Sequence, residues 1–187
     1  MQITPTILTT ERLTLRWLEA RDAPALFAIF SDPEVMRYWS SPAWTDIAQA
    51  EAAIEQSLEA CRAGASVRFG VELPATGEVI GTVTLYSFYA MNRRCETGYA
   101  LARAHWGRGY VVEALAAALD YGFRALDLNR VEADIDPRNE ASGRVLERLG
   151  FRKEGYMRER WIVNGEVCDS VYYGLLRSDW HTRQRAG

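Results

Sequence analysis

The chain has 187 residues, and at roughly 150 residues per domain this length predicts one domain spanning residues 1–187. Hydrophobic residues make up 48% and charged residues 25%, which excludes a disordered or fibrous chain. The formal net charge is −3, so we expect no nucleic-acid partner, and any anion site must be local.

Strands and helices alternate along the first half of the chain. Residues 12–17 alternate apolar and polar side chains, as in a half-buried strand. Residues 22–30 and 46–62 carry apolar residues at helical spacing, and the first of these helices begins at the capping residue Asp22. Residues 67–73 and 79–89 are then predicted to form an antiparallel pair, joined by a turn with Pro and Gly.

The second half continues the alternation. Residues 96–101 form a short predicted strand, followed by an Ala-rich helix over 110–126. A strand over 131–135 precedes a compact helix over 139–149, which Asn139 caps and Gly150 ends. Two long strands, 151–163 and 167–176, flank Asn164-Gly165, a strong hairpin signal. The order predicts a mixed α+β fold.

Composition and cysteine spacing indicate a cytoplasmic protein without a metal. We expect no membrane partner, because no apolar run approaches the ~20 residues of a membrane span and the first residues do not resemble a signal peptide. Cys61, Cys95 and Cys168 are widely spaced and lack the paired pattern of a zinc site. We therefore expect three reduced thiols.

The segment Trp106-Gly107-Arg108-Gly109-Tyr110 connects a predicted strand to the long Ala-rich helix. Glycines at such a junction let the backbone turn tightly, and the helix start exposes unpaired N–H groups at the positive end of its dipole. Arg108 adds a full charge, so the pattern favours a phosphate or pyrophosphate site. A Gly-x-Gly alone describes a tight structural turn equally well, and neither the P-loop nor the dinucleotide fingerprint is complete here.

Two blocks of sequence resemble motifs of the GNAT superfamily of acetyl-CoA-dependent N-acetyltransferases. The first runs from Glu96-Thr97-Gly98-Tyr99 through the glycine segment to Glu113-Ala114. The second is Asn139-Glu140-Ala141-Ser142, followed by Leu149-Gly150-Phe151. The resemblance implies the GNAT fold, with a central mixed, mostly antiparallel sheet of six to seven strands flanked by about four helices.

Three further features are similar to the RimJ/RimL branch of that superfamily: Thr10-Glu11-Arg12-Leu13, Trp106, and the stretch from Asn164-Gly165 through Asp169. Members of this branch acetylate protein N-termini, small amines or antibiotics, so the resemblance does not select an acceptor. Some members dimerise through their late strands, and a homodimer is compatible with the resemblance.

Acetyl-CoA is the co-substrate that the resemblance implies. Backbone amides would hold its pyrophosphate at Gly107, Arg108, Gly109, Tyr110 and Val111. The backbone of Leu101, Ala102 and Arg103 would pair with the pantetheine arm, which Asn139 and Ser142 would also approach. Ala104 stands where the superfamily often has Gln or Arg, and the charge of Arg103 or Arg108 can substitute for it.

Acetyl transfer needs a neutral amine, and an alkyl ammonium with a pKa near 10.4 is mostly protonated at neutral pH. The resemblance makes Glu96 the candidate base, directly or through a water. The alternatives are that Glu96 forms an ion pair or orients the substrate, and Glu159 and Asp169 are rival carboxylates. Cys95 has no histidine nearby in sequence, so we predict direct attack in a ternary complex, without an acyl-enzyme.

The departing thiolate needs a proton or a hydrogen-bond donor. Several members of the superfamily use a Tyr at the position that Leu146 holds here, so Ser142 is the candidate donor. Both Ser142 and Asn139 can equally serve only to cap their helix.

Six aromatic residues are candidates for lining an acceptor cleft, although large aromatics are more often core residues: Trp39, Trp44, Tyr86, Phe88, Tyr89 and Trp161. The predicted function is acetyl transfer from acetyl-CoA to the primary amine of a protein N-terminus or a small molecule. The alternative is a non-catalytic module that binds acyl-CoA or a regulatory partner.

Overall fold

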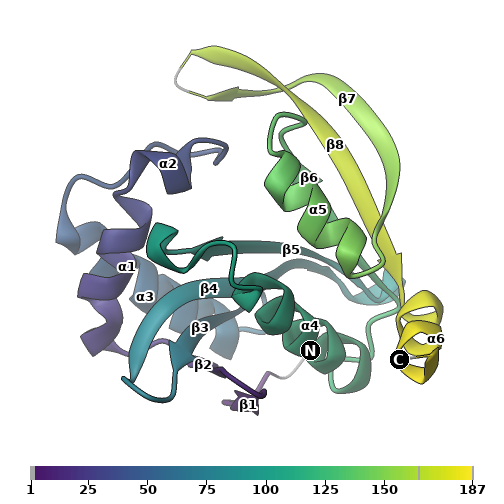
Figure 1. The fold of residues 1–187 in the computed structure, drawn as a ribbon, viewed down its shortest axis with the longest axis horizontal. Helices are drawn as coiled ribbons and strands as arrows, with labels where there is room; N and C mark the ends of the chain where they lie inside the picture. Colours follow the sequence, from purple (N-terminus) through teal and green to yellow (C-terminus); the bar gives the residue numbers. More distant parts are fainter. Residues whose placement is uncertain (1–2, 164, 187) are drawn as a thin grey trace.

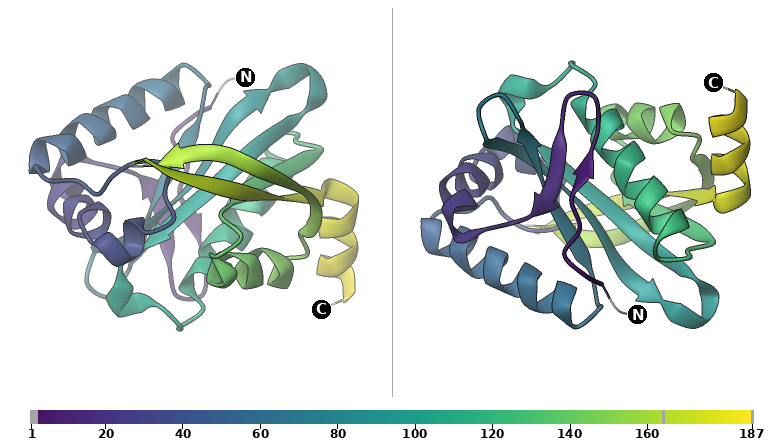
Figure 2. Two further views of the ribbon diagram at one scale, coloured as in Figure 1. Left: turned by 90° about the horizontal axis from the view of Figure 1, so that it is seen from above. Right: turned by 90° about the horizontal axis from the view of Figure 1, so that it is seen from below.

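A computed structural model describes residues 3–163 and 165–186 of the chain. One eight-stranded sheet of order β1-β2-β3-β4-β5-β6-β8-β7 forms the centre, and helices cover both of its faces (Figures 1 and 2). Neighbouring strands run antiparallel except for β5 and β6, which are parallel. The predicted mixed, mostly antiparallel fold is confirmed.

The boundaries of the elements follow the predicted punctuation closely. The strands are β1 Leu8–Thr9, β2 Thr14–Trp17, β3 Val67–Leu73, β4 Glu78–Tyr89, β5 Arg94–Leu101, β6 Arg130–Ile135, β7 Arg152–Val163 and β8 Glu166–Leu176. The α-helices are α1 Ala23–Phe30, α2 Pro33–Met36, α3 Ile47–Arg62, α4 Tyr110–Arg124, α5 Glu140–Arg148 and α6 Arg177–Ala186.

Within the described residues the sheet has one strand more than the predicted upper limit of seven, and there are two α-helices more than the predicted four. The additional elements are β1, α2 and α6. β1 has two residues and α2 has four, which is too short for a period of two or 3.6 to be visible. α6 is mostly polar, and among its residues 177–183 only Trp180 is buried in the core. Of the predicted hairpin turn, Asn164 lies outside the described residues.

The helices pack on the sheet through the apolar stripes seen in the sequence. α4 buries Leu115, Leu119 and Phe123, each four residues from the next, and packs against β4 and β5. α1 buries Leu26 and Ile29 in a second cluster on the other face, together with residues of α3. Figure 2 shows the two helical layers on either side of the sheet. The sheet between them is therefore covered by helices on both faces.

A buried ionic cluster joins the start of α1 to the sheet. The guanidinium of Arg16, on β2, donates to both carboxylate oxygens of Asp22 at 2.7 and 2.9 Å and to Glu72 on β3 at 2.6 Å. The side chains of Arg16 and Asp22 are only 10% and 5% exposed. Burial opposes ionisation of Asp22, but the hydrogen bonds from Arg16 and the Glu19 backbone N–H, together with the positive charges of Arg16 and Arg21, outweigh it and hold the pKa of Asp22 below its ordinary value.

The two parallel strands separate soon after they begin to pair. β5 and β6 are in register only over Arg94–Glu96 and Arg130–Glu132, although β5 continues to Leu101 and β6 to Ile135. Beyond Glu96 one edge of β5 is therefore free of the neighbouring strand. This fork between β5 and β6 is the feature around which the candidate site is built.

Candidate active site

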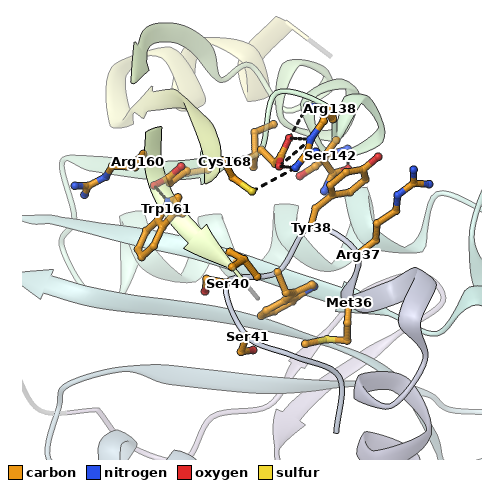
Figure 3. A pocket seen from close by; sticks show the side chains of 18 of the residues that line it. Met36, Arg37, Tyr38, Ser40, Ser41, Arg138, Ser142, Arg160, Trp161 and Cys168 are labelled. Atoms are coloured by element: carbon orange, nitrogen blue, oxygen red, sulfur yellow. Dashed lines mark hydrogen bonds and ion pairs between the residues drawn. The ribbon is translucent and has the colours of Figure 1, made fainter. Parts of the chain in front are cut away.

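A cavity of about 720 Å³ lies at the fork between β5 and β6. Its walls come from the segment that includes and follows α2, from the end of β6, from the start of α5, and from the hairpin of β7 and β8. Figure 3 shows Tyr38 and Ser40 on the α2 side of this cavity and Arg160, Trp161 and Cys168 on the hairpin side. Residues more than 120 positions apart in sequence thus enclose one space.

Glu96 lies at the fork and lines the cavity, half-buried. Its cross-strand partners are Tyr86 on β4, which hydrogen-bonds to it, and Glu132 on β6. Burial raises the pKa of the Glu96 carboxyl, the negative charges of Glu132 and Asp134 raise it further, and the opposing effects of Arg94 and Tyr86 are smaller. A carboxylate with a raised pKa is a stronger base, and this one faces the cavity.

Ser142 lies in the first turn of α5 and is paired with a tyrosine of β5. The hydroxyl oxygens of Ser142 and Tyr99 are 2.6 Å apart, and the Tyr99 hydroxyl also lies 3.2 Å from the carbonyl oxygen of Ser142. Both residues line the cavity. Each hydroxyl has one proton and two acceptor positions. When Tyr99 donates to Ser142 Oγ, the Ser142 proton is free to bond a group in the cavity.

Asn139 caps α5, because its side-chain oxygen accepts the backbone N–H of Ser142 at 3.1 Å. The capping interpretation of the Asn139 side chain is thereby confirmed. The same bond holds the backbone of Ser142 in the first turn of α5, where its hydroxyl meets that of Tyr99. Asn139 lines the cavity as well.

Loss of this cap should lower stability modestly. We expect Asn139→Ala to reduce the free energy of unfolding by about 1 kcal/mol, because one backbone N–H of the first turn loses its acceptor. Urea titration followed by circular dichroism measures the change. Asn139→Asp keeps an acceptor at the cap and is the matched control, expected to retain most of the stability; equal losses in both variants would show that capping is not the role of this side chain.

The glycine segment before α4 (residues 106–110, the cradle) has an open backbone at the N-terminus of a helix. Gly107 and Gly109 adopt φ angles of +74° and +80°, in the left-handed region where a side chain is strained. Gly109 is the N-cap residue of the 15-residue helix α4, whose first N–H groups point away from the helix without partners within it. A Cβ atom at Gly107 would meet no atom within 4 Å, so the backbone there is open to a ligand.

The end of β5 is held by bonds that the sequence did not predict. Ala102 N–H donates to Ile80 of β4 at 2.8 Å, and the indole N–H of Trp106 donates to the carbonyl oxygen of Leu101 at 2.7 Å. Trp106 therefore ties the glycine segment back to the strand. Arg103 lies in the intervening turn, and its guanidinium is 3.4 Å from Asp32.

The six aromatic candidates for the acceptor cleft fall into two groups. Trp39, Tyr86 and Trp161 line the cavity, whereas Trp44, Phe88 and Tyr89 do not. Trp44 instead packs on Phe30 with the ring centroids 4.7 Å apart, beside the cluster that α1 and α3 form. Of the rival carboxylates, Asp169 lines the cavity but accepts bonds from Tyr156 and the backbone N–H of Glu159.

Several cavity residues were missed by the sequence analysis. Besides Tyr99, they include Asp134 on β6. The Asp134 carboxylate accepts the indole N–H of Trp161, one of the aromatic candidates, at 3.2 Å. Tyr99 belongs to the first of the two blocks that resemble GNAT motifs. Nothing in the spacing of that block indicated that α5 would bring Ser142 beside Tyr99. Counting all lining residues, the cavity carries five carboxylates and three arginines. It is therefore suited to a cationic ligand.

The cysteines are buried and unpaired, as predicted. Burial, together with Glu132 and Glu96, raises the pKa of the Cys95 thiol, which therefore stays protonated and is a poor nucleophile. Among residues 3–163 and 165–186, no group of three or more His, Cys, Asp or Glu side chains has a metal-binding arrangement. Over the same residues, no helix is long and apolar enough to span a bilayer.

Comparison with known families gives one match that covers most of the chain. The model of an acetyltransferase (GNAT) domain matches residues 12–152. Among curated proteins, the uncharacterized N-acetyltransferase p20 of Bacillus licheniformis is 40% identical over 173 residues, covering 92% of this chain and 97% of that protein. The ribosomal protein uS5-alanine N-acetyltransferase of Escherichia coli K12 is 32% identical over 186 residues, covering 92% of each.

Solved structures give the same family. RimJ of Mycobacterium smegmatis, in complex with CoA-disulfide, has a TM-score of 0.84 and 26% identity, covering 98% of this chain and 95% of that one. Spermidine N-acetyltransferase of Vibrio cholerae, in complex with CoA and spermine, has a TM-score of 0.81 and 27% identity, covering 92% and 99%. The predicted resemblance to RimJ-like enzymes is confirmed.

Proposed function

The chain belongs to the GNAT acetyltransferase family, and on this premise we propose that it transfers the acetyl group of acetyl-CoA to a primary amine by direct attack in a ternary complex. One observation carries the proposal. The same strand, β5, brings Glu96 and Tyr99 into the cavity and leads at its end to the glycine segment that begins α4. A base and an anion cradle are thus joined by about ten residues of chain.

The proposed binding of acetyl-CoA divides between two regions. The amides of Gly107, Arg108, Gly109, Tyr110 and Val111 would hold the pyrophosphate, because the backbone there is open and the helix dipole favours negative charge. The edge of β5 that β6 leaves free, up to Leu101, would hold the pantetheine arm through backbone bonds. Acetyl-CoA supplies an activated acetyl group as a thioester.

The chain's own residues would manage two protons. Glu96 would accept the proton that the amine loses as the C–N bond forms. Ser142, with Tyr99 donating to its oxygen, would give a hydrogen bond to the sulfur as the C–S bond breaks and the electron pair moves to the thiolate. The proton held by Glu96 then returns to solvent, and the thiolate takes one up. The products are an N-acetyl amine and the free thiol of CoA.

The acceptor proposed here is a cationic amine. The excess of carboxylates in the cavity favours an ammonium in the binding step, and Glu96 can then deprotonate it. One relative is named for the alanine N-terminus of ribosomal protein uS5 and one structural neighbour for spermidine. We accordingly propose a protein N-terminus or a small polycation as the acceptor class.

The test measures release of the CoA thiol with a disulfide reagent that develops colour on reaction with thiols. The acceptors tested are a panel of N-terminal peptides and small amines. Turnover with at least one acceptor, and mass spectrometry that finds the product heavier by one acetyl group, are the expected results. Binding of CoA without turnover on any acceptor would support the non-catalytic module instead.

The cradle gives a prediction with a matched control. We expect Gly107→Asp to bind CoA about tenfold more weakly than Gly107→Asn, because a carboxylate there would repel the pyrophosphate. Asp and Asn have the same size and tolerate the left-handed backbone similarly, so the comparison isolates charge. Isothermal titration calorimetry measures both dissociation constants; equal values would place the pyrophosphate elsewhere.

A further inference from the structure

The sequence feature Thr10-Glu11-Arg12-Leu13 has no part in the proposed chemistry, yet the structure joins it to the cradle. The carboxylate of Glu113, in the first turn of α4, accepts the Thr10 hydroxyl at 2.6 Å, the Arg12 backbone N–H at 2.9 Å and the Arg12 Nε at 2.7 Å. A second guanidinium nitrogen, Nη2, lies 2.6 Å from the same carboxylate. The guanidinium of Arg12 is therefore held in one orientation.

The remaining nitrogen of the Arg12 guanidinium reaches the glycine segment. Arg12 Nη1 donates to the carbonyl oxygen of Arg108 at 3.0 Å, and the guanidinium lies over the ring of Tyr110, 4.7 Å from its centroid. Glu113 also acts through its own backbone, because its N–H donates to the carbonyl oxygen of Gly109 at 3.1 Å. Arg12 thus bonds one peptide carbonyl of the cradle, and Glu113 bonds the next one.

Fixing these carbonyls fixes the amides of the same peptide units. In a trans peptide the C=O and N–H point in opposite directions. A bond that holds the Arg108 carbonyl therefore aims the N–H of Gly109, and the bond on the Gly109 carbonyl aims the N–H of Tyr110. Glycine makes this control necessary, because residues 107 and 109 have wide conformational freedom without it.

We propose that Arg12 and Glu113 are positioning residues for the pyrophosphate of CoA: they act through the carbonyl of Arg108 to hold the amides of the cradle toward the ligand. The inference rests on the proposed function, since it takes CoA to be the ligand. Preset donors bind an anion more tightly than donors that must first be ordered.

The charges in the network support positioning over direct attraction. Burial of the Glu113 carboxyl opposes ionisation, but the bonds from Thr10 and Arg12 outweigh it and hold its pKa below the ordinary value. Glu113 therefore stays ionised at neutral pH and neutralises Arg12. A pair with no net charge attracts pyrophosphate little, so its contribution must come from geometry.

Removal of the Glu113 carboxylate distinguishes positioning from direct attraction, because the two roles predict opposite changes in the Kd for CoA. Glu113→Gln frees the Arg12 charge but releases its orientation. Under positioning, we expect the Kd for CoA to rise about tenfold, as for loss of a hydrogen bond that involves a charged group. Under direct attraction, the unmasked Arg12 would tighten binding. Arg12→Gln is expected to weaken CoA binding by a similar factor, and Glu11→Gln, an exposed neighbour, is the control expected to stay within twofold.

The experiment is calorimetry with CoA on the full chain, together with KM values for acetyl-CoA and for S-acetylpantetheine, which lacks the pyrophosphate. The proposal expects KM for acetyl-CoA to rise in Glu113→Gln while KM for S-acetylpantetheine stays constant. Unchanged or tighter CoA binding in Glu113→Gln would overturn the proposal, and so would equal increases in KM for acetyl-CoA and for S-acetylpantetheine. Failure of the unmodified protein to bind CoA would instead contradict the proposed function, so the two failures are distinguishable.

Discussion

Replacing Glu96 by Gln is expected to lower kcat/KM about 10²- to 10⁴-fold, the range typical for loss of a general base. The amide has nearly the same shape as the carboxylate and can still bond Tyr86, so the cavity should keep its form. Steady-state kinetics with the best acceptor of the panel measures the loss. Binding of CoA to the variant should be unchanged, because the cradle lies at the other end of β5.

The pH profile gives the same prediction an independent readout. Since burial and the neighbouring carboxylates raise the pKa of Glu96, kcat/KM should fall as the pH drops through a value above that of an ordinary Glu. That acidic limb should be absent in Glu96→Gln. Glu159→Gln and Cys95→Ala are the controls and should retain activity; loss of activity in Cys95→Ala, with Glu96→Gln active, would contradict direct attack.

Removal of Asp22 is expected to cost about 3–5 kcal/mol of the free energy of unfolding, because it takes one partner from a buried ion pair and leaves Arg16 with Glu72 alone. Asp22→Ala also removes the acceptor of the Glu19 backbone N–H, which donates to Asp22 at 2.7 Å. Urea denaturation at pH 7 measures the change. A loss below about 1 kcal/mol would mean that the pair contributes no more than a surface one.

Arg144→Ala is the matched control, since Arg144 pairs with Glu140 on an exposed face, with 69% and 80% of the side chains accessible. We expect a change of about 0.5 kcal/mol or less. Acid gives a second check. The pKa of Asp22 is lowered on folding, so its contribution is present above the unfolded value of roughly 3.9 and is lost as the pH falls through the lower, folded value. The gap between the unmodified protein and Asp22→Ala should close only in that acidic range.

Local patterns predicted most elements because their causes are local. The helix that Asn139 caps and Gly150 ends was bounded from these two residues, and α5 spans Glu140–Arg148. The glycine junction was found because a left-handed backbone demands glycine within a few residues. β1 was missed because a two-residue strand exists only through its pairing with β2.

The candidate site was predicted in part. Glu96, Ser142 and the glycine segment were predicted from the sequence and its resemblance to a family. In the structure, Glu96 and Ser142 line one cavity. Trp44 was placed in the same cleft, but it packs on Phe30 instead, since an aromatic residue in a loop carries no signal of which side it faces. The fork itself was invisible, because strand periodicity does not say where two strands stop pairing.

The amino-acid sequence by itself determined the type and order of the elements, their caps, and the residue types that acid–base and anion-binding chemistry need. These depend on neighbours within one turn of helix or one strand. Only the tertiary structure decided that Tyr99 meets Ser142, and that Arg12 bonds Glu113, 101 positions away. Such contacts arise when separate helices and strands pack on one sheet, and no local pattern in the chain encodes the distance between them.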